Sequence, residues 1–357
     1  MSRLLRALAA LAVVAVAAGA YAFVRSTTAD PANPGAGQAL WWRPRQITFV
    51  LNASAYQGGC GSIDDAKAAA RASFPAWMTA TQAGASQPCT DFKFNDCGDT
   101  SRTDLGYDSN NPGSNANLVV FRSGLCSAIS DARCHPANPQ DIGPCIEAFN
   151  CWSHDSRTGT GGTLALTTVT FVPSTGEILD ADMELNSWNG SLSAPTGFYF
   201  TCASGPTCAT AYGGSSCAAF DIQNTVTHEA GHMLGLDHIC VIGGTPPSNM
   251  CPAGDLPTMA PTASLGDIDK RTLAPDDVAG VCSIYPAGSP TQMANASPSG
   301  DVPTTTVAIS APLACPPGAS SSSSGGCSTG GGGAWSLLAL ALVVRPRRRR
   351  SAASANG

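Results

Sequence analysis

The stretch His228-Glu229-Ala230-Gly231-His232-Met233-Leu234-Gly235-Leu236-Asp237-His238 contains three of the five histidines of the chain. His228 and His232 are four positions apart, so on a helix both imidazoles lie on one face, about one turn apart, and can bind one ion. Gly235 permits a sharp backbone turn, after which His238 can return as a third ligand. Three imidazoles with one coordination position left open are typical of a catalytic zinc site rather than a structural one.

Glu229 directly follows the first histidine and could lie beside the ion without binding it. A carboxylate in that place can take a proton from a zinc-activated water and so act as the general base of hydrolysis. Two histidines four apart on a helix surface are commonplace when nothing else accompanies them. Because Glu229, Gly235 and His238 all stand in register with them, a zinc hydrolase is the better interpretation.

The residues around this motif predict an α+β domain over 41–287 with five strands and three helices. Alternating β-branched and apolar residues predict strands at 46–52, 91–95, 117–122, 163–172 and 177–186. Helical patterns with start and stop signals lie at 62–77, 221–234 and 275–285.

The eleven-residue motif and its flanks resemble the matrixin branch of the metzincin metallopeptidases, the family of the matrix metalloproteinases. The resemblance spans residues 41–286 and includes the segments FDIQNTVTHEAGHMLGLDH and LAPDDVAGVCSIYP. It implies a metzincin-like catalytic domain of the α+β class, with a five-stranded mixed sheet, three helices and the zinc site in the cleft. It also implies a zinc metalloendopeptidase that hydrolyses peptide bonds of proteins. By their positions in the family motif, Glu229 would be the general base, and the zinc ligands would be His228, His232 and His238.

The resemblance also implies roles for residues outside the motif. The strand around Leu164, Ala165 and Leu166 would rim the cleft and pair with an extended protein or peptide substrate through main-chain hydrogen bonds. Members of the family have a methionine turn beneath the zinc. Met259 is our candidate, because the final helix follows it at a matrixin-like distance. Met250 competes with it, and either could instead be a core methionine.

Some features depart from the family. Ile239 follows the third histidine, where matrixins usually have serine, and Leu166 occupies the place of a ligand of their second zinc site. Only His135 and His154 remain for such a site, so we expect one catalytic zinc alone. Three acids alternate onto one face of a predicted strand and could bind Ca²⁺, but a solvated acidic face is the better-supported alternative: Asp180, Asp182 and Glu184.

The two ends of the chain resemble export signals. Residues 1–22 have a basic start, an apolar run and the small residues Ala18 and Ala20, which predicts a signal peptide removed near Ala20 or Ala22. An uncleaved membrane anchor is the alternative. Residues 23–40 are a predicted linker, and 288–326 a disordered tether rich in Pro, Ser and Gly.

The tail 327–357 contains Cys327, four glycines, a short apolar run and a cluster of arginines. It resembles the myxobacterial C-terminal sorting tag, which implies cleavage near Cys327 and retention at the cell surface. A simple tail anchor is the alternative. Either way we expect an exported, extracellular or surface-anchored protein that meets a membrane only through this tail.

Fifteen cysteines favour an oxidising compartment and disulfides. Sequence-near pairings were the first candidates: Cys89–Cys97, Cys145–Cys151, Cys202–Cys208 and Cys240–Cys251. Seven of the 19 basic residues lie in the two ends, which leaves 12 against 25 acids, a net charge of −13, in the middle. Such a surface repels nucleic acid, so we expect no nucleic-acid partner.

Two other classes of function fit parts of the pattern. A surface adhesin could bind zinc without catalysis, although the intact Glu229 argues against it. A metal-dependent hydrolase could instead act on cell-wall material rather than on proteins.

Overall fold

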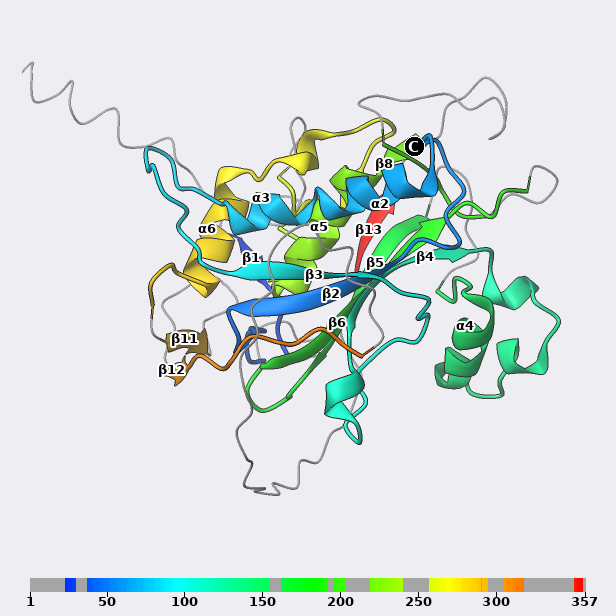
Figure 1. Ribbon diagram of the computed structural model, residues 1–357, viewed down its shortest axis with the longest axis horizontal. Coiled ribbons are helices and arrows are strands. Elements are labelled where there is room, and N and C mark those ends of the chain that lie inside the picture. The colour runs from blue at the N-terminus through cyan, green and yellow to red at the C-terminus, as the bar shows by residue number, and fades with distance from the viewer. Residues whose placement is uncertain are drawn as a thin grey trace, which may run out of the picture.

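The computed structural model of the protein describes residues 23–29, 37–154, 162–191, 196–202, 219–239, 257–289, 291–294, 305–317 and 350–355. A mixed sheet runs through the molecule, and helices lie along it (Figure 1). The predicted signal peptide, Met250, and the cysteines at 208, 217, 240, 251 and 327 fall outside the described residues. Within the described part, no helix has both the length and the apolar character needed to cross a bilayer.

Five strands form the main sheet in the order β3-β2-β4-β6-β5. They are β2 (Gln46–Asn52), β3 (Lys93–Asp99), β4 (Asn117–Ser123), β5 (Gly162–Phe171) and β6 (Ile178–Ser187). β2 is parallel to β3 and β4, β4 is parallel to β6, and β5 is antiparallel to β6. The predicted α+β class and five-stranded mixed sheet are therefore confirmed. Beyond β5 the ladder continues through β13 (Arg350–Ala355) and β10 (Thr262–Ala263).

The remaining elements are short or lie outside this sheet. The longer helices are α2 (Ile63–Arg71), α3 (Phe74–Met78), α4 (Gly143–Phe149), α5 (Ile222–Met233) and α6 (Pro275–Ile284). Short strands are β1 (Val24–Arg25), β7 (Tyr199–Thr201), β8 (Ala219–Asp221), β9 (Leu236–Asp237), β11 (Thr291–Ala294) and β12 (Thr305–Ala308). Single 3₁₀ turns are Pro112–Ser114, Cys126–Ala128, Ala132–Cys134, Pro139–Ile142 and Asp269–Arg271.

The helix predicted over 62–77 is two helices in the structure. Ser62 caps α2 as expected, because its hydroxyl accepts the N–H of Asp65. The helix then ends at Arg71, and α3 begins at Phe74 with Pro75 in its first turn. Proline has no N–H and disfavours the helical conformation of the residue before it, so a break two to three residues earlier relieves that conflict.

Two buried tryptophans hold α5, the helix that carries the histidine motif. Trp77 Nε1 donates to the carbonyl of Thr227 at 2.9 Å, and Trp42 Nε1 donates to that of Met233 at 2.7 Å. Both indoles are about fully buried and pack in the main core with Val226. Since these contacts come from the segment just before β2 and from α3, they hold the helix at two points along its length.

The predicted linker 23–40 contributes to the fold where it is described. β1 pairs antiparallel with β9, directly after the histidine helix. Arg25 is buried and its guanidinium donates to the carbonyl of Leu40. Ser26 donates its N–H to the carbonyl of Gly235 at 2.8 Å. This part of the linker therefore supports the turn that leads to His238.

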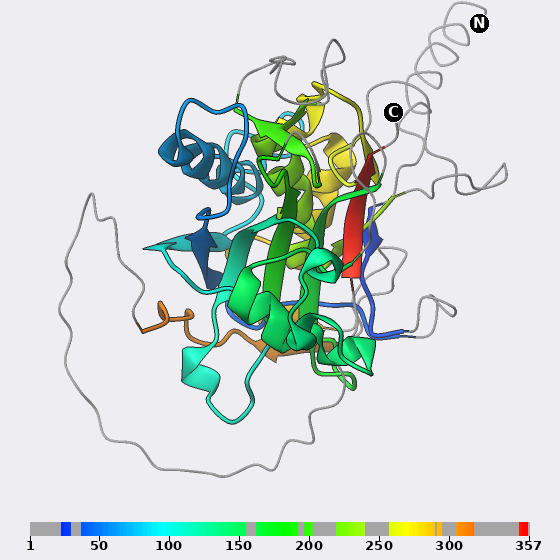
Figure 2. The same cartoon turned by 90° about the vertical axis from the view of Figure 1, so that its right-hand side faces the viewer.

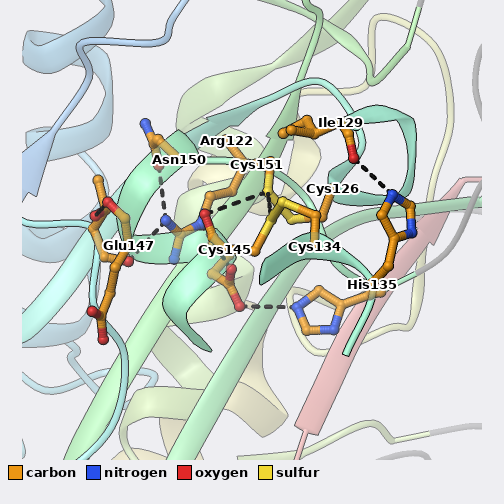
Figure 3. The surroundings of a disulfide bond; sticks show 12 residues. Arg122, Cys126, Ile129, Cys134, His135, Cys145, Glu147, Asn150 and Cys151 are labelled. Atoms are coloured by element: carbon orange, nitrogen blue, oxygen red, sulfur yellow. Dashed lines mark hydrogen bonds and ion pairs between the residues drawn. A yellow bond between two sulfur atoms is a disulfide. The ribbon is translucent and has the colours of Figure 1, made fainter. Parts of the chain in front are cut away.

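A cysteine-rich lobe containing α4 projects from one end of the sheet (Figures 1 and 2). Its two disulfides are Cys126–Cys151 and Cys134–Cys145, which lie next to each other (Figure 3). Three more join distant parts of the chain: Cys60–Cys202, Cys89–Cys282 and Cys97–Cys315. Disulfide bonding is thus confirmed, and so is Cys97 as a half-cystine.

The sequence-near pairings were wrong for three of four cases. Cys89–Cys97, Cys145–Cys151 and Cys202–Cys208 each include a cysteine that bonds a different partner, and Cys240–Cys251 lies outside the described residues. Cys145 Sγ and Cys151 Sγ are nevertheless only 3.4 Å apart. Spacing along the chain brings sulfurs near each other without deciding which of them bond.

Part of the predicted tether lies against the domain. In the extension 305–317, residues 310–314 lie beside residues 43–48, where Leu313 donates its N–H to the carbonyl of Gln46 at 3.1 Å. The Cys97–Cys315 disulfide then joins this extension to β3. The structure differs here from a free tether, because the chain is bonded to the sheet region up to Cys315.

Candidate metal centre

His228 and His232 lie on α5, whose first turn is capped by Asp221. The Asp221 carboxylate accepts the N–H of Asn224 at 2.7 Å and also binds the guanidinium of Arg271. The helix stops at Gly235, which has φ +90°. A Cβ there would lie 2.5 Å from the carbonyl oxygen of Leu40, so only glycine fits this turn.

The structure brings the three histidines together. The Nε2 atoms of His228, His232 and His238 are each 3.2 Å from the other two. No other described residues converge in this way except Cys126, Cys145 and Cys151, which are all in disulfides. The three imidazoles could therefore hold one metal ion.

Backbone carbonyls orient two of these rings from behind. His228 Nδ1 lies against the carbonyl of Thr258, and His232 Nδ1 lies 2.8 Å from that of Leu236. A carbonyl can only accept, so Nδ1 carries the proton in both rings and Nε2 presents its lone pair inward. Hydrogen bonds of this kind fix the tautomer that a metal ligand needs.

Burial keeps the imidazoles in their neutral form. It lowers the pKa of His228 and of His238 well below the ordinary value. The neighbouring cation Lys270 adds to the effect on His228, and the neighbouring His232 adds to that on His238. Neutral imidazole is the form that binds a metal, so the site is ready to do so at neutral pH.

The predicted methionine turn lies beneath these rings. Each backbone polar group of Thr258 and Met259 has a partner: the two N–H groups donate to Asp277, the Thr258 carbonyl accepts from His228, and the Met259 carbonyl accepts from Ile239 N at 3.2 Å. The turn thus joins the first histidine to the residue that follows the third. Ile239, the departure from the family pattern, takes part through its backbone alone.

The Met259 side chain packs closely under the helix. A Cβ on Gly231 would lie 2.3 Å from Met259 Sδ and 2.8 Å from the Trp77 ring. Glycine at this position of the motif is therefore required by the approach of the methionine to the helix.

Glu229, which follows His228 on α5, is buried and is held by a residue that the sequence did not indicate. Thr167 of β5 donates its hydroxyl to Glu229 Oε2 at 2.7 Å. The two residues are 62 positions apart, and no spacing rule connects them. β-branched residues are common in strands, so the threonine had no distinguishing signal.

Lys270 is a second residue that sequence reasoning missed. Its ammonium is buried, donates to the carbonyl of Ala260 and lies 3.5 Å from His228 Nδ1. Burial lowers the pKa of this lysine to about 8. It lies in a 3₁₀ turn whose pattern gave no sign that it reaches the histidines.

The predicted cleft rim, Leu164 to Leu166, lies on β5 at the edge of the main five strands. Their side chains are buried on the two faces of the sheet. Their backbone N–H and C=O groups point along the sheet, and so toward this edge. There β13 pairs antiparallel with β5, with Ala353 opposite Ala165 and Ala352 opposite Leu166. The edge therefore accepts an extended chain as an added strand.

The acidic face of β6 is not solvated, and that interpretation was wrong. Asp180, Asp182 and Glu184 do share one face, but each is at most 1% exposed. Asp182 accepts the backbone N–H groups of Gly106 and Leu118, and Glu184 binds Arg122. The loop after β3 and the cysteine-rich lobe cover this face. The three acids are not among the described groups that converge on one point, so nothing in the geometry favours Ca²⁺ there.

The two remaining histidines are not part of the cluster. His154 Nε2 lies 2.9 Å from Glu184, and His135 Nε2 lies 2.7 Å from the carbonyl of Ile129 in the lobe (Figure 3). Each ring is thus occupied by a protein partner.

Comparison with known proteins adds no relative. No family model matches the chain, and no curated protein matches it.

Proposed function

We propose that the protein is a secreted or surface-anchored zinc metalloendopeptidase that hydrolyses peptide bonds of proteins, with Glu229 as general base. The observation that carries this proposal is the triangle of His228, His232 and His238 Nε2 atoms, 3.2 Å on each side. Three neutral imidazole nitrogens are a donor set that zinc prefers in catalytic sites, where a fourth position stays open, so these residues would fit zinc.

When bound, zinc supplies Lewis acidity, which polarises a carbonyl and makes a water acidic enough to react near neutral pH. The residues of the chain supply the remaining steps. Glu229 takes the proton of the attacking water and passes it to the leaving amine. The β5 edge aligns the substrate as an added strand, as the resemblance to matrixins implies.

The test uses the full chain, a casein or gelatin substrate, and a measurement of bound metal on the same sample. A chelator is expected to abolish cleavage and zinc to restore it. Glu229→Ala is expected to keep the metal and lose at least about 100-fold in turnover, the contribution of a general base. Undiminished cleavage by that variant contradicts the assignment.

His135→Ala is the matched control, because it removes a histidine that lies outside the cluster. It should leave both metal content and cleavage unchanged. Bound metal without any cleavage would favour the adhesin, and release of peptidoglycan without protein cleavage would favour the cell-wall hydrolase.

A further inference from the structure

A hydroxyl from the sheet contacts the carboxylate of the proposed general base. Thr167 Oγ1 donates to Glu229 Oε2 at 2.7 Å and lies 3.2 Å from the backbone carbonyl of the same residue. Both side chains are fully buried. One hydroxyl proton serves two acceptors, and the shorter contact is with the charged one, which makes the stronger hydrogen bond.

We propose that Thr167 is a positioning residue for Glu229, which holds the carboxylate in the orientation needed for proton transfer. The proposal rests on the proposed function for its catalytic consequence. The contact itself is a structural relationship between β5 and α5.

Packing alone does not account for a threonine at this position. Valine has almost the same shape, and burying a hydroxyl costs free energy unless it forms a hydrogen bond. Thr170, on the same strand, also has a buried hydroxyl, and it has no partner within the described structure. The hydroxyl of Thr167 thus differs from that of Thr170 in its bond to Glu229.

The bond also links the substrate edge to the base. Thr167 directly follows Leu166 on the strand that would pair with an extended substrate. Its own side chain points to the helix, whereas the backbone of the neighbouring residues faces the edge. Binding of a peptide along β5 would therefore stiffen the strand that holds the carboxylate, which ties correct substrate placement to correct placement of the base.

Kinetics of three variants of the full chain test this role. Thr167→Val is expected to lower kcat about tenfold or more while KM and zinc content stay within about twofold, because proton transfer loses its alignment and substrate pairing does not. Thr167→Ser restores a hydroxyl at the same Cβ and should recover most of the lost kcat. Thr170→Val, the matched control, should leave kcat and KM unchanged.

An equal loss in Thr167→Val and Thr167→Ser would overturn the proposal, since the hydroxyl would then not be what matters. A rise in KM with unchanged kcat would do the same, because it would assign the residue to substrate binding.

Unfolding by urea gives a readout that does not depend on activity. Thr167→Val should raise the unfolding equilibrium constant, and this rise should be at least tenfold larger in the unmodified chain than in a chain carrying Glu229→Ala. If the unmodified chain cleaves no protein, the proposed function fails. This double-mutant cycle would still test the hydrogen bond between Thr167 and Glu229. Equal effects in the two backgrounds would overturn the positioning role.

Discussion

The guanidinium of Arg122 binds the carboxylate of Glu184 at 2.8 Å, and both side chains are fully buried. The pair joins β4 to β6 under the cysteine-rich lobe. Arg122 Nη1 also donates to the carbonyl of Thr103 and to the side chain of Asn150, the residue at the end of α4 (Figure 3). Burial raises the pKa of Glu184, but the arginine and His154 outweigh it and hold the value at about 2.

Replacing Arg122 by methionine should therefore destabilise the fold strongly. The variant keeps the length of the side chain but leaves Glu184 as a buried carboxylate with only His154 beside it. The expected loss in free energy of unfolding is about 3–5 kcal/mol, measured by urea denaturation. Arg43→Met is the control, because the pair of Arg43 and Glu177 is partly exposed, with side chains 37% and 19% exposed; that change should cost at most about 1 kcal/mol. Similar losses in the two variants would contradict the role of the buried pair.

Asp180 and Asp182 should make stability fall as the pH rises. Burial raises the pKa of Asp182 to about 6 from 3.8 and raises that of Asp180 further. When folding raises the pKa of a carboxyl, its protonated form stabilises the folded state. This contribution is complete below the pKa of the group in the unfolded chain, and it is lost as the pH rises through the pKa in the folded chain. Between pH 4 and pH 6 the folded chain therefore binds more protons than the unfolded chain, and unfolding becomes easier.

Asp180→Asn should remove most of that pH dependence. An amide keeps a hydrogen-bond donor toward Asp182 and cannot ionise. We expect a higher urea midpoint than the unmodified chain at pH 7.5. The difference should stay within about 0.5 kcal/mol at pH 3.5, where both carboxyls are protonated in the folded chain and about two-thirds protonated in the unfolded chain. A variant that is less stable than the unmodified chain at pH 7.5 would show that the pair carries a net stabilising charge.

Gly231 should not tolerate even one added methyl group. A Cβ would meet Met259 Sδ at 2.3 Å and the Trp77 ring at 2.8 Å, and both neighbours are buried. Gly231→Ala is expected to cost about 1–3 kcal/mol in unfolding free energy and to weaken metal binding, because it displaces the turn that orients His228. Gly113→Ala is the control: nothing lies within 4 Å of its added Cβ, and stability should change by less than about 0.5 kcal/mol. An unchanged metal affinity in Gly231→Ala would show that the turn at Thr258 and Met259 does not influence metal binding.

The sequence was informative wherever a local pattern carries the structure. The alternation of residues 46–52 predicted β2 with its observed ends, and the histidine spacing predicted which side chains converge. The break between α2 and α3 shows a conflict between signals, since the alanine-rich pattern favours one helix and Pro75 forbids it.

Contacts between distant segments could not be predicted in this way. Alternation placed Asp180, Asp182 and Glu184 on one face, but whether that face meets water depends on the lobe that covers it. Three disulfides join cysteines 142, 193 and 218 positions apart, which no spacing rule reveals. Thr167 and Lys270 reach the site only because the sheet and a 3₁₀ turn pack on α5.

The Cys97–Cys315 disulfide should hold the extension 305–317 on the sheet. The Cys89–Cys282 disulfide already joins the same two regions. The additional loop that Cys97–Cys315 closes therefore contains about 33 residues between Cys282 and Cys315 and about 8 between Cys89 and Cys97. A loop of roughly 40 residues corresponds to an upper estimate of about 4 kcal/mol in the chain-entropy model. Much of that effect should be local, because the extension is bonded to β2 by few hydrogen bonds.

The double variant Cys97→Ser with Cys315→Ser, made in a Glu229→Ala background to prevent self-cleavage, tests this local role. Hydrogen exchange at the amides of Ser310 and Leu313 should become at least tenfold faster, while exchange in α5 stays slow. Loss of the Cys134–Cys145 disulfide in the lobe is the control and should leave those two amides protected. If both amides keep their protection without Cys97 and Cys315, the extension is held by its own contacts with β2, and the disulfide is not what keeps it in place.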